Sequence, residues 1–331
     1  NWTARPDLWL GSFKFPLERS AGVTREEIER GYRLVLGREP ESEAVYNVHS
    51  AHLDYDALVR DLMSSTEYRN RNMRWRPFYD GVDPMAVLRR HEARERKPVA
   101  GSIVNFLGVS TDLHYVSWAQ ERVESLPVPG NFHATEAEWT AALRAVDLAK
   151  DHFTVVELGA GWGCWIVNTA VAAKRLGMSV TAIGVEGDHK HIGFMKRHCV
   201  ANGLSEAEFV ADEAVAGTSG GAAFPVYDDA GNAYGQEPRF FETEPELDAF
   251  LSDNRNYRKV PAKTLGNIFA DLQRVDLLHI DIQGGEEEII RKSVDEINAK
   301  VAYIVVGTHG RDLEGQIMAL LLEEGWVLEI E

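Results

Sequence analysis

The chain has 331 residues, of which 44% are hydrophobic and 26% charged, and its formal net charge is −17. This hydrophobic content supports a sizeable core, and the length favours two modules over one. The excess of carboxylates argues against general affinity for nucleic acid, because a phosphate backbone is bound by clustered cations. The sequence contains no apolar run of membrane-spanning length and no signal peptide.

The cysteine content indicates a reducing compartment. Cys164 and Cys199 have neither the spacing of metal ligands nor a disulfide framework, and both fall in segments of helical period. A free buried thiol is the usual state there, and we expect a cytoplasmic protein. The sequence begins at Asn1 rather than at Met, which is consistent with a trimmed piece of a longer protein.

The first module is expected to be a small all-α unit. Thr24 and Glu27 have the spacing of a capping box, and Gly37 is expected to close the first helix. Further helices are predicted over 41–52 and 55–68, and an aromatic-bearing arm over 1–20.

Two stretches of this module, Tyr32–Pro40 and Ser64–Tyr68, carry a likeness. Over residues 20–70 the chain resembles a domain of unassigned function that recurs in bacterial cell-surface and glycan-assembly proteins. The likeness is compatible with docking of a protein partner, but a plain three-helix packing module is the safer interpretation of the pattern.

A basic stretch over 69–97 follows. Arginine interleaved with aromatic residues can bind nucleic acid or anionic sugar, but glutamates interrupt the run and favour a solvated linker. We therefore place the domain boundary after residue 98, giving modules 1–98 and 99–331. The cations of this stretch are Arg69, Arg71, Arg74, Arg76, Arg89, Arg90, Arg94, Arg96 and Lys97.

The next segment, 99–132, is rich in aromatic residues and leads into a predicted helix over 136–150. Such a segment can fold over a ligand cleft or simply fill the core, and both interpretations stay open.

A glycine-rich turn then joins a buried strand to an alanine-rich helix. The turn reads Gly159-Ala-Gly161-Trp162-Gly163, with Glu157 two residues before it. This is the opening unit of an open α/β sheet. A dinucleotide fingerprint requires Gly-x-Gly-x-x-Gly, and an acid before the loop suits a cationic ligand better than a diphosphate. The pattern resembles the first motif of methyltransferases that use S-adenosylmethionine (SAM), where this loop holds the methionine half of SAM.

Acids end the next two predicted strands. Glu186, followed by Gly187, closes the strand 180–185, where a carboxylate can bind a ribose diol in NAD and SAM sites alike. Asp212 and Glu213 close the strand 208–215 and are candidates to accept from an adenine amino group. A long insertion over 216–263 is assigned to acceptor recognition.

The fourth strand, 275–282, carries His279, Asp281 and Gln283 on one face. His309 follows the fifth strand, 302–306, so it is expected beside Asp281 at the carboxyl edge of the sheet, where ligands of open α/β sheets bind. A sixth strand is expected to begin at Trp326.

Several motifs in order carry a family likeness. From Trp139 onward the chain resembles the FkbM family of SAM-dependent methyltransferases, which implies a doubly wound, Rossmann-like sheet and O-methylation of sugar or polyketide hydroxyls, often in glycan assembly. The carriers are Val156–Gly163, Gly184–Asp188, Ala201–Leu204 and Asp276–Glu286.

Two departures from the family pattern matter. The family commonly has Lys-Ile-Asp-x-Glu-Gly at the fourth strand, where this chain has His279 and Gln283 in place of the Lys and Glu. Its fold also has a seventh, antiparallel strand, whereas this sequence stops in the expected sixth.

Methyl transfer to a hydroxyl needs a base, because an alcohol is a poor nucleophile until its proton is being removed. We predict His309 as that base with Asp281 in support, and count His279 among the candidate catalytic residues. In a variant, Asp281 and His309 hold Mg²⁺, which lowers the pKa of the acceptor. The predicted cofactor-binding residues are Glu157, Gly159, Gly161, Trp162, Gly163, Glu186, Gly187, Asp212, Glu213 and Asp281.

Two other classes of function remain. An NAD-type oxidoreductase is disfavoured by the missing glycine of the dinucleotide fingerprint. A catalytically weak scaffold that docks a glycan-assembly partner is disfavoured by the intact acids. The expected partner is a sugar, glycan or glycoconjugate acceptor; a homo-oligomer is compatible with the sequence.

Overall fold

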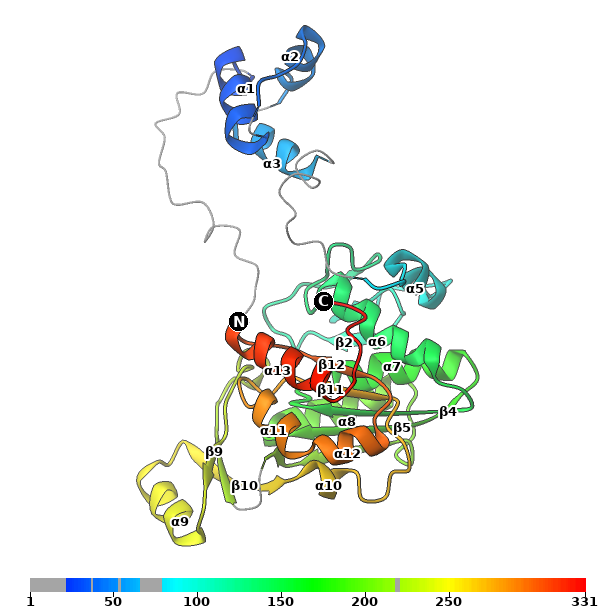
Figure 1. Cartoon of the computed structure of the whole chain (residues 1–331), viewed down its shortest axis with the longest axis vertical. Coiled ribbons are helices and arrows are strands. Elements are labelled where there is room, and N and C mark those ends of the chain that lie inside the picture. Colours follow the sequence, from blue (N-terminus) through cyan, green and yellow to red (C-terminus); the bar gives the residue numbers. More distant parts are fainter. Residues whose placement is uncertain (1–21, 37, 53–54, 66–78, 218–220) are drawn as a thin grey trace. The chain divides into compact units, whose positions relative to one another are not determined.

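The computed structural model describes residues 22–36, 38–52, 55–65, 79–217 and 221–331. The predicted arm over 1–20, the helix end at Gly37, the motif end over 66–68 and the arginines of 69–76 lie outside the described residues. The chain divides into two compact units, Asn1–Pro77 and Phe78–Glu331, which are considered separately (Figure 1).

The first unit consists of short helices around a small apolar core. Its elements are α1 (Arg25–Gly31), the π-helix η2 (Tyr32–Leu36), α2 (Glu43–His49) and α3 (Tyr55–Ser64). The predicted capping box is confirmed, because Thr24 and Glu27 exchange side chain-to-backbone hydrogen bonds at the start of α1. The core residues are Val23, Ile28, Tyr32, Leu36, Leu58 and Leu62.

The second unit begins with a mixed segment that precedes the main sheet. It contains α5 (Pro84–His91), β1 (Ser102–Val104), β2 (Ser110–Asp112), β3 (Arg122–Val123) and α6 (Glu136–Leu148). The three short strands form a sheet in the order β2-β1-β3. Helix α6, which the sequence predicts, starts where the side chain of Thr135 accepts the N–H of Glu138.

The main sheet has five parallel strands in the order β12-β11-β4-β5-β6. Strand β4 is central, and the chain leaves it first toward one edge and later toward the other. This reversal is the topological switch point of doubly wound folds, beside which ligands bind at the carboxyl ends of the strands. The strands are β4 (His152–Leu158), β5 (Ser179–Glu186), β6 (Phe209–Glu213), β11 (Leu277–Ile280) and β12 (Ile304–Val306).

Helices cover both faces of this sheet, which confirms the predicted fold class. Along β4, Phe153 and Val155 join the core under α6, α7 (Cys164–Arg175) and α8 (His189–Ala201). The alternate residues Val156 and Leu158 join the second core. That core packs under α10 (Leu265–Ile268), α11 (Glu286–Lys292), α12 (Val294–Lys300) and α13 (Arg311–Glu323). Burial on both faces explains why these strands read as continuous apolar runs.

The insertion folds into a small sheet of its own. Its strands pair in the order β7-β10-β8-β9, and Figure 1 shows α9 and β9 projecting away from the main sheet. The elements are β7 (Val215–Ala216), β8 (Gly221–Pro225), the 3-10 helix η3 (Ala230–Asn232), β9 (Arg239–Phe241), α9 (Glu244–Asp253) and β10 (Tyr257–Lys263).

The prediction of a sixth strand from Trp326 is wrong. Residues 326–331 form only an isolated antiparallel bridge, Ile330 to Tyr79, and the backbone N–H of Asp80 donates to the carbonyl of Glu329. Glu329 is held by side-chain contacts instead, a salt bridge to Arg144 on α6 and a hydrogen bond from the hydroxyl of Tyr303, and the segment adds no strand to the main sheet. Within the described ranges, no helix is both long enough and apolar enough to span a bilayer.

Candidate active site

The glycine turn between β4 and α7 is tight, and its shape requires glycine. Gly159, Gly161 and Gly163 have φ values of +76°, +53° and +76°, a region that side chains disfavour. A Cβ atom on Gly159 would lie 1.8 Å from the backbone oxygen of Asp281. The turn therefore lies in direct contact with the chain that leaves β11.

Glu157 is directed at the helix that follows this turn. Its side chain is buried, and its two oxygens accept the backbone N–H groups of Trp165 and Ile166 at 3.2 and 2.9 Å, in the first turn of α7. Burial raises the pKa of the carboxyl group to about 7. Glu157 thus satisfies free donors of α7, and its contact with a cofactor stays a prediction.

A Glu157→Gln substitution should change how stability depends on pH. The folded-state pKa lies above the ordinary 4.5, so the folded chain retains a proton that the unfolded chain loses, and wild-type stability falls as pH rises from 4.5 to about 7. The neutral variant should lack this loss, so between pH 4.5 and about 7 the free energy of unfolding of the wild type should fall by roughly 3 kcal/mol more than that of the variant. Urea unfolding at several pH values measures it, with exposed Glu206→Gln as the control; identical pH dependence for variant and wild type would contradict the prediction.

Glu186 closes β5 against the same turn. It is 6% exposed, and it accepts the N–H groups of Gly161 and Asp188, both at 2.7 Å. Burial opposes the charge on the neighbouring His191, but the hydrogen bond and charge of Glu186 raise the pKa of that histidine. The carboxylate that the sequence predicts at a ribose position is therefore buried beside the glycine turn.

Gly187, the next residue, packs against the insertion. A Cβ atom on Gly187 would lie 2.5 Å from the ring of Phe224 in β8. The absence of a side chain at this position allows the insertion to approach the end of β5.

The two acids that end β6 are paired with cations of the insertion strand β10. Asp212 accepts from Lys263 at 2.8 and 2.7 Å, and Glu213 forms ion pairs with Arg258 and His189. Burial opposes ionisation of Glu213, but these two partners hold the pKa of its carboxyl group below the ordinary value. The observed contacts thus join β6 to the insertion, and an adenine contact stays a prediction.

Asp281, Glu286 and His309 form an acid–imidazole group at the carboxyl edge. His309 Nε2 lies 3.3 Å from Asp281 Oδ1, and its Nδ1 lies 3.1 Å from Glu286 Oε1. These two carboxylates raise the pKa of His309 to about 9, so the imidazole is protonated at neutral pH. The ligand atoms of the three residues all lie within 4.8 Å of one another, close enough to share a divalent cation.

The sequence reading placed Asp281 beside His309 but gave no role to Glu286. Glu286 starts α11 and is buried, and its carboxylate accepts the N–H groups of Ile282 and Gly284. An acid in the first turn of a helix after a Gly-Gly pair is the signal that identifies it. Gln283 also contacts the group, because its amide donates to Asp281 Oδ1 at 2.8 Å.

His279 belongs to a different environment from this group. It is 1% exposed under α6 and α7, where its Nε2 lies 3.2 Å from Glu138 Oε1 and its ring stacks on Trp165 at 5.1 Å. Burial lowers its pKa, but the hydrogen bond and charge of Glu138 outweigh burial and raise it overall. His279 and Asp281 still interact, because burial opposes the charge of Asp281, but the hydrogen bond from His309 and, next, the charge of His279 hold the pKa of Asp281 below its ordinary value.

Three buried ring nitrogens near the turn have no hydrogen-bond partner: Trp162 Nε1, His133 Nε2 and His279 Nδ1. Their rings form a row through Trp165, with centroids 5.0 Å apart for His133–Trp162, 5.3 Å for His133–Trp165 and 5.1 Å for Trp165–His279. An unpaired buried polar atom costs about 1–3 kcal/mol. This row therefore fits a polar ligand held beside the glycine turn, and His133, in a loop without a motif, was missed from sequence.

Aromatic residues from two distant segments meet over the turn. The hydroxyl of Tyr234, in the insertion, donates to the backbone carbonyl of Tyr115 at 2.8 Å. The ring of Tyr234 contacts Trp162 at 4.9 Å and Trp118 at 5.5 Å. Trp118 is 44% exposed, so it presents an aromatic surface to solvent next to the turn.

The sheet is parallel and doubly wound, with a glycine turn at the central strand and a buried acid at the end of the next strand. These features place the fold in the Rossmann-like class. Residues 151–326 match the family described as the methyltransferase FkbM domain. The chain is also 37% identical over 249 residues to "Putative methyltransferase" of Jannaschia sp. (strain CCS1), covering 74% of this chain and 88% of that protein. The chain belongs to the FkbM methyltransferase family.

A solved structure, human methyltransferase 10 domain containing protein, is similar over 74% of this chain and 88% of that chain, with 13% sequence identity and a TM-score of 0.36. The family match is what identifies this chain as a methyltransferase. It starts at residue 151, so the likeness of the N-terminal module to glycan-assembly proteins stays a prediction.

Proposed function

We propose that the chain is a SAM-dependent O-methyltransferase that acts on a hydroxyl of a sugar or glycan. The observation that carries this proposal is the contact between Gly159 and the backbone of Asp281, which puts the acid–imidazole group directly beside the glycine turn. Members of this family generally use SAM, which supplies an electrophilic methyl group when it is bound. The family does not by itself fix the acceptor.

The residues around the turn fit a nucleoside cofactor with a charged amino-acid tail. Oε2 of Glu186 accepts only the backbone N–H of Gly161 among the described residues and keeps a further acceptor site for a ribose hydroxyl, whereas Oε1 already faces the N–H of Asp188 and the ring of His191. The unpaired Trp162 Nε1 offers a donor, and the backbone of Gly159, Gly161 and Gly163 allows close approach. Asp281 is a further candidate, because Gln283 and His309 both contact its Oδ1.

In the proposed mechanism His309 takes the proton of the acceptor hydroxyl while the acceptor oxygen gains the methyl group, and the methyl–sulfur bond lost in that exchange would release S-adenosylhomocysteine as the leaving group. Glu286 holds the ring through Nδ1, so the proton is taken at Nε2, where the acceptor hydroxyl has to replace the 3.3 Å contact with Asp281. Both carboxylates then stabilise the imidazolium that forms. Because the pKa of His309 is about 9, only a minor fraction is in the basic form at neutral pH. Proton transfer is therefore expected to become faster as the pH rises.

A sugar acceptor is supported by the aromatic surface over the turn. Trp118 is 44% exposed next to Trp162 and Tyr234, and a tryptophan ring packs well on the apolar face of a pyranose while the hydroxyls remain solvated. A polyketide hydroxyl is the alternative acceptor for the same surface.

A Mg²⁺ variant of the mechanism uses the same group of side chains. Asp281 and Glu286 would supply oxygen ligands and His309 a nitrogen ligand, and an ion there would lower the pKa of a bound hydroxyl. Histidine is an uncommon Mg²⁺ ligand, which favours the metal-free mechanism. Docking of a glycan-assembly partner remains a proposal for the module that we place at 1–98.

Isothermal titration of the full chain with SAM, S-adenosylhomocysteine and NAD, with and without Mg²⁺, tests the cofactor. We expect saturable binding of the first two at micromolar concentration and none of NAD. Binding of NAD alone, or silence toward all three, would reject the proposal. Dependence of turnover on Mg²⁺ would select the metal variant.

A further inference from the structure

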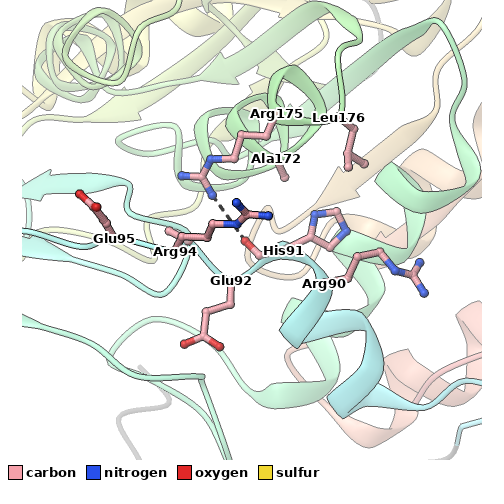
Figure 2. Close-up of a pocket in the computed structure, with 9 residues that line it drawn as sticks. Arg90, His91, Glu92, Arg94, Glu95, Ala172, Arg175 and Leu176 are labelled. Carbon is pink, nitrogen blue, oxygen red and sulfur yellow. Dashed lines mark hydrogen bonds between the residues drawn. The ribbon is translucent and has the colours of Figure 1, made fainter.

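A pocket lies at the far end of α7 from the glycine turn. It has a volume of 410 Å³ and is formed where the end of α5 and the residues after it meet the end of α7. Figure 2 shows its lining, which includes Arg90, His91, Arg94, Arg175 and Leu176. Helix α7 has 12 residues, so about 18 Å of helix separates this pocket from the turn. The pocket is therefore distinct from the candidate active site.

Of the two carboxylates of the lining, Glu92 is paired with a cation outside it, and Glu95 is exposed to solvent, which screens its charge. Glu92 forms an ion pair with Arg96 at 3.0 Å, and Glu95 lies 3.9 Å from Lys97. Among the arginines of the lining, Arg90 forms an ion pair with Asp147 of α6. Arg94 and Arg175 are the two remaining arginines of the lining.

Neither Arg94 nor Arg175 has a carboxylate partner among the described residues. Arg175 donates to the backbone carbonyls of His91 and Leu107, which hold its guanidinium group in place without neutralising it. Burial lowers the pKa of Arg175, which reflects the cost of an uncompensated cation there. Arg94 is exposed, and within the described part of the chain its side chain forms no hydrogen bond or ion pair. Two positive charges in one small pocket also repel each other.

We propose that this pocket binds the phosphoryl group of a small ligand, with Arg94 and Arg175 as its counter-cations. A guanidinium fork matches the oxygen geometry of a phosphate, and charge-assisted hydrogen bonds of this kind are about twice as strong as neutral ones. Ala93, Ala172 and Leu176 add apolar wall for the rest of the ligand. The volume falls in the range of small-molecule sites, roughly 300–1,000 Å³.

The negative charge of the rest of the chain favours a ligand with one phosphoryl group over an extended polyanion. With a net charge of −17 the chain as a whole repels anions, so an extended polyanion is disfavoured while one phosphoryl group can be bound by two converging arginines. Arg90 and Arg94 come from the basic stretch of the sequence, and Arg175 comes from a helix far along the chain.

The test is titration of the full chain with pyrophosphate and with glucose 6-phosphate, using glucose as the uncharged control. We expect saturable binding of both phosphates and none of glucose. Arg94→Ala and Arg175→Gln should each weaken binding at least about tenfold, whereas Arg89→Ala, an exposed arginine outside the lining, should not. Arg94→Ala removes no internal contact, so a loss of binding in that variant does not reflect unfolding.

Vesicles of phosphatidylcholine with phosphatidylglycerol separate the sources of the phosphoryl group. Cosedimentation that depends on Arg94, without binding of the soluble phosphates, would assign the group to a lipid headgroup. Absence of binding in all arms, or binding that Arg94→Ala and Arg175→Gln leave unchanged, would overturn the proposal. Binding of SAM is measured in parallel, so failure at this pocket is distinguishable from failure of the proposed function.

Discussion

His309→Ala should bind S-adenosylhomocysteine like the wild type and lose turnover by about 10²–10⁴-fold, the usual contribution of a general base. The substitution removes the imidazole that lies between Asp281 and Glu286, but it leaves the glycine turn and Glu186 intact. His152→Ala is the matched control, since His152 is an exposed histidine at the opposite end of β4. Near-normal turnover of His309→Ala would reject the role of His309.

The pH profile of the wild type gives an independent check on the same residue. A base with a pKa of about 9 should make turnover rise about tenfold per pH unit below that value and level off above it. A flat profile between pH 7 and about 9 would contradict the mechanism. If the group holds a divalent ion, the rise of turnover should shift to lower pH, because the ion displaces the proton of His309. A chelator should then abolish turnover.

The raised pKa of His309 also has a consequence for stability. The folded state favours the protonated imidazole, so its contribution is complete below the unfolded pKa of 6.5 and is lost as the pH rises through about 9. Assays at alkaline pH should therefore be run with unfolding measured in parallel.

Gly159→Ala should produce the second large effect, a loss of both stability and cofactor binding. Its new Cβ atom would lie 1.8 Å from the carbonyl oxygen of Asp281, which is backbone and cannot move aside cheaply. We expect the free energy of unfolding to fall by about 3 kcal/mol or more, as for strained or overpacked sites. Urea unfolding measures this loss, and titration with SAM measures the loss of binding.

Gly177→Ala is the control that distinguishes the steric clash at Gly159 from the strain of a positive φ alone. Gly177 also has a positive φ, +87°, but a Cβ atom there would meet nothing within 4 Å. Its substitution should cost only about 1 kcal/mol, the penalty for a side chain in the left-handed region. Equal losses for Gly159→Ala and Gly177→Ala would show that the contact with Asp281 is unimportant.

The parts of this molecule that depend on local patterns were predicted well. The glycine turn was identified because its residues and the strand before it are contiguous, and Asp281 was placed beside His309 because parallel strands end at one edge. The capping box at Thr24 is equally local.

What depends on distant partners was not predictable in the same way. The side chain of Glu157 is oriented by the backbone N–H groups in the first turn of α7, which donate to its carboxylate. The course of residues 326–331 is decided by Tyr79 and Arg144, and neither partner can be read from the segment itself. The unpaired nitrogen of His133 is visible only once α6 and α7 are packed.

The position of Tyr234 affects how this protein can change over evolutionary time. Its ring, supplied by the insertion, would be 3.1 Å from a Cβ atom on Gly161, and it stacks on His191 with centroids 4.3 Å apart. The insertion, for which acceptor recognition stays a prediction, therefore also covers the glycine turn that we propose as the cofactor loop. If evolution replaced this insertion to accept a different substrate, the contacts that cover the turn would be replaced with it. Acceptor range and cofactor affinity are therefore expected to change together.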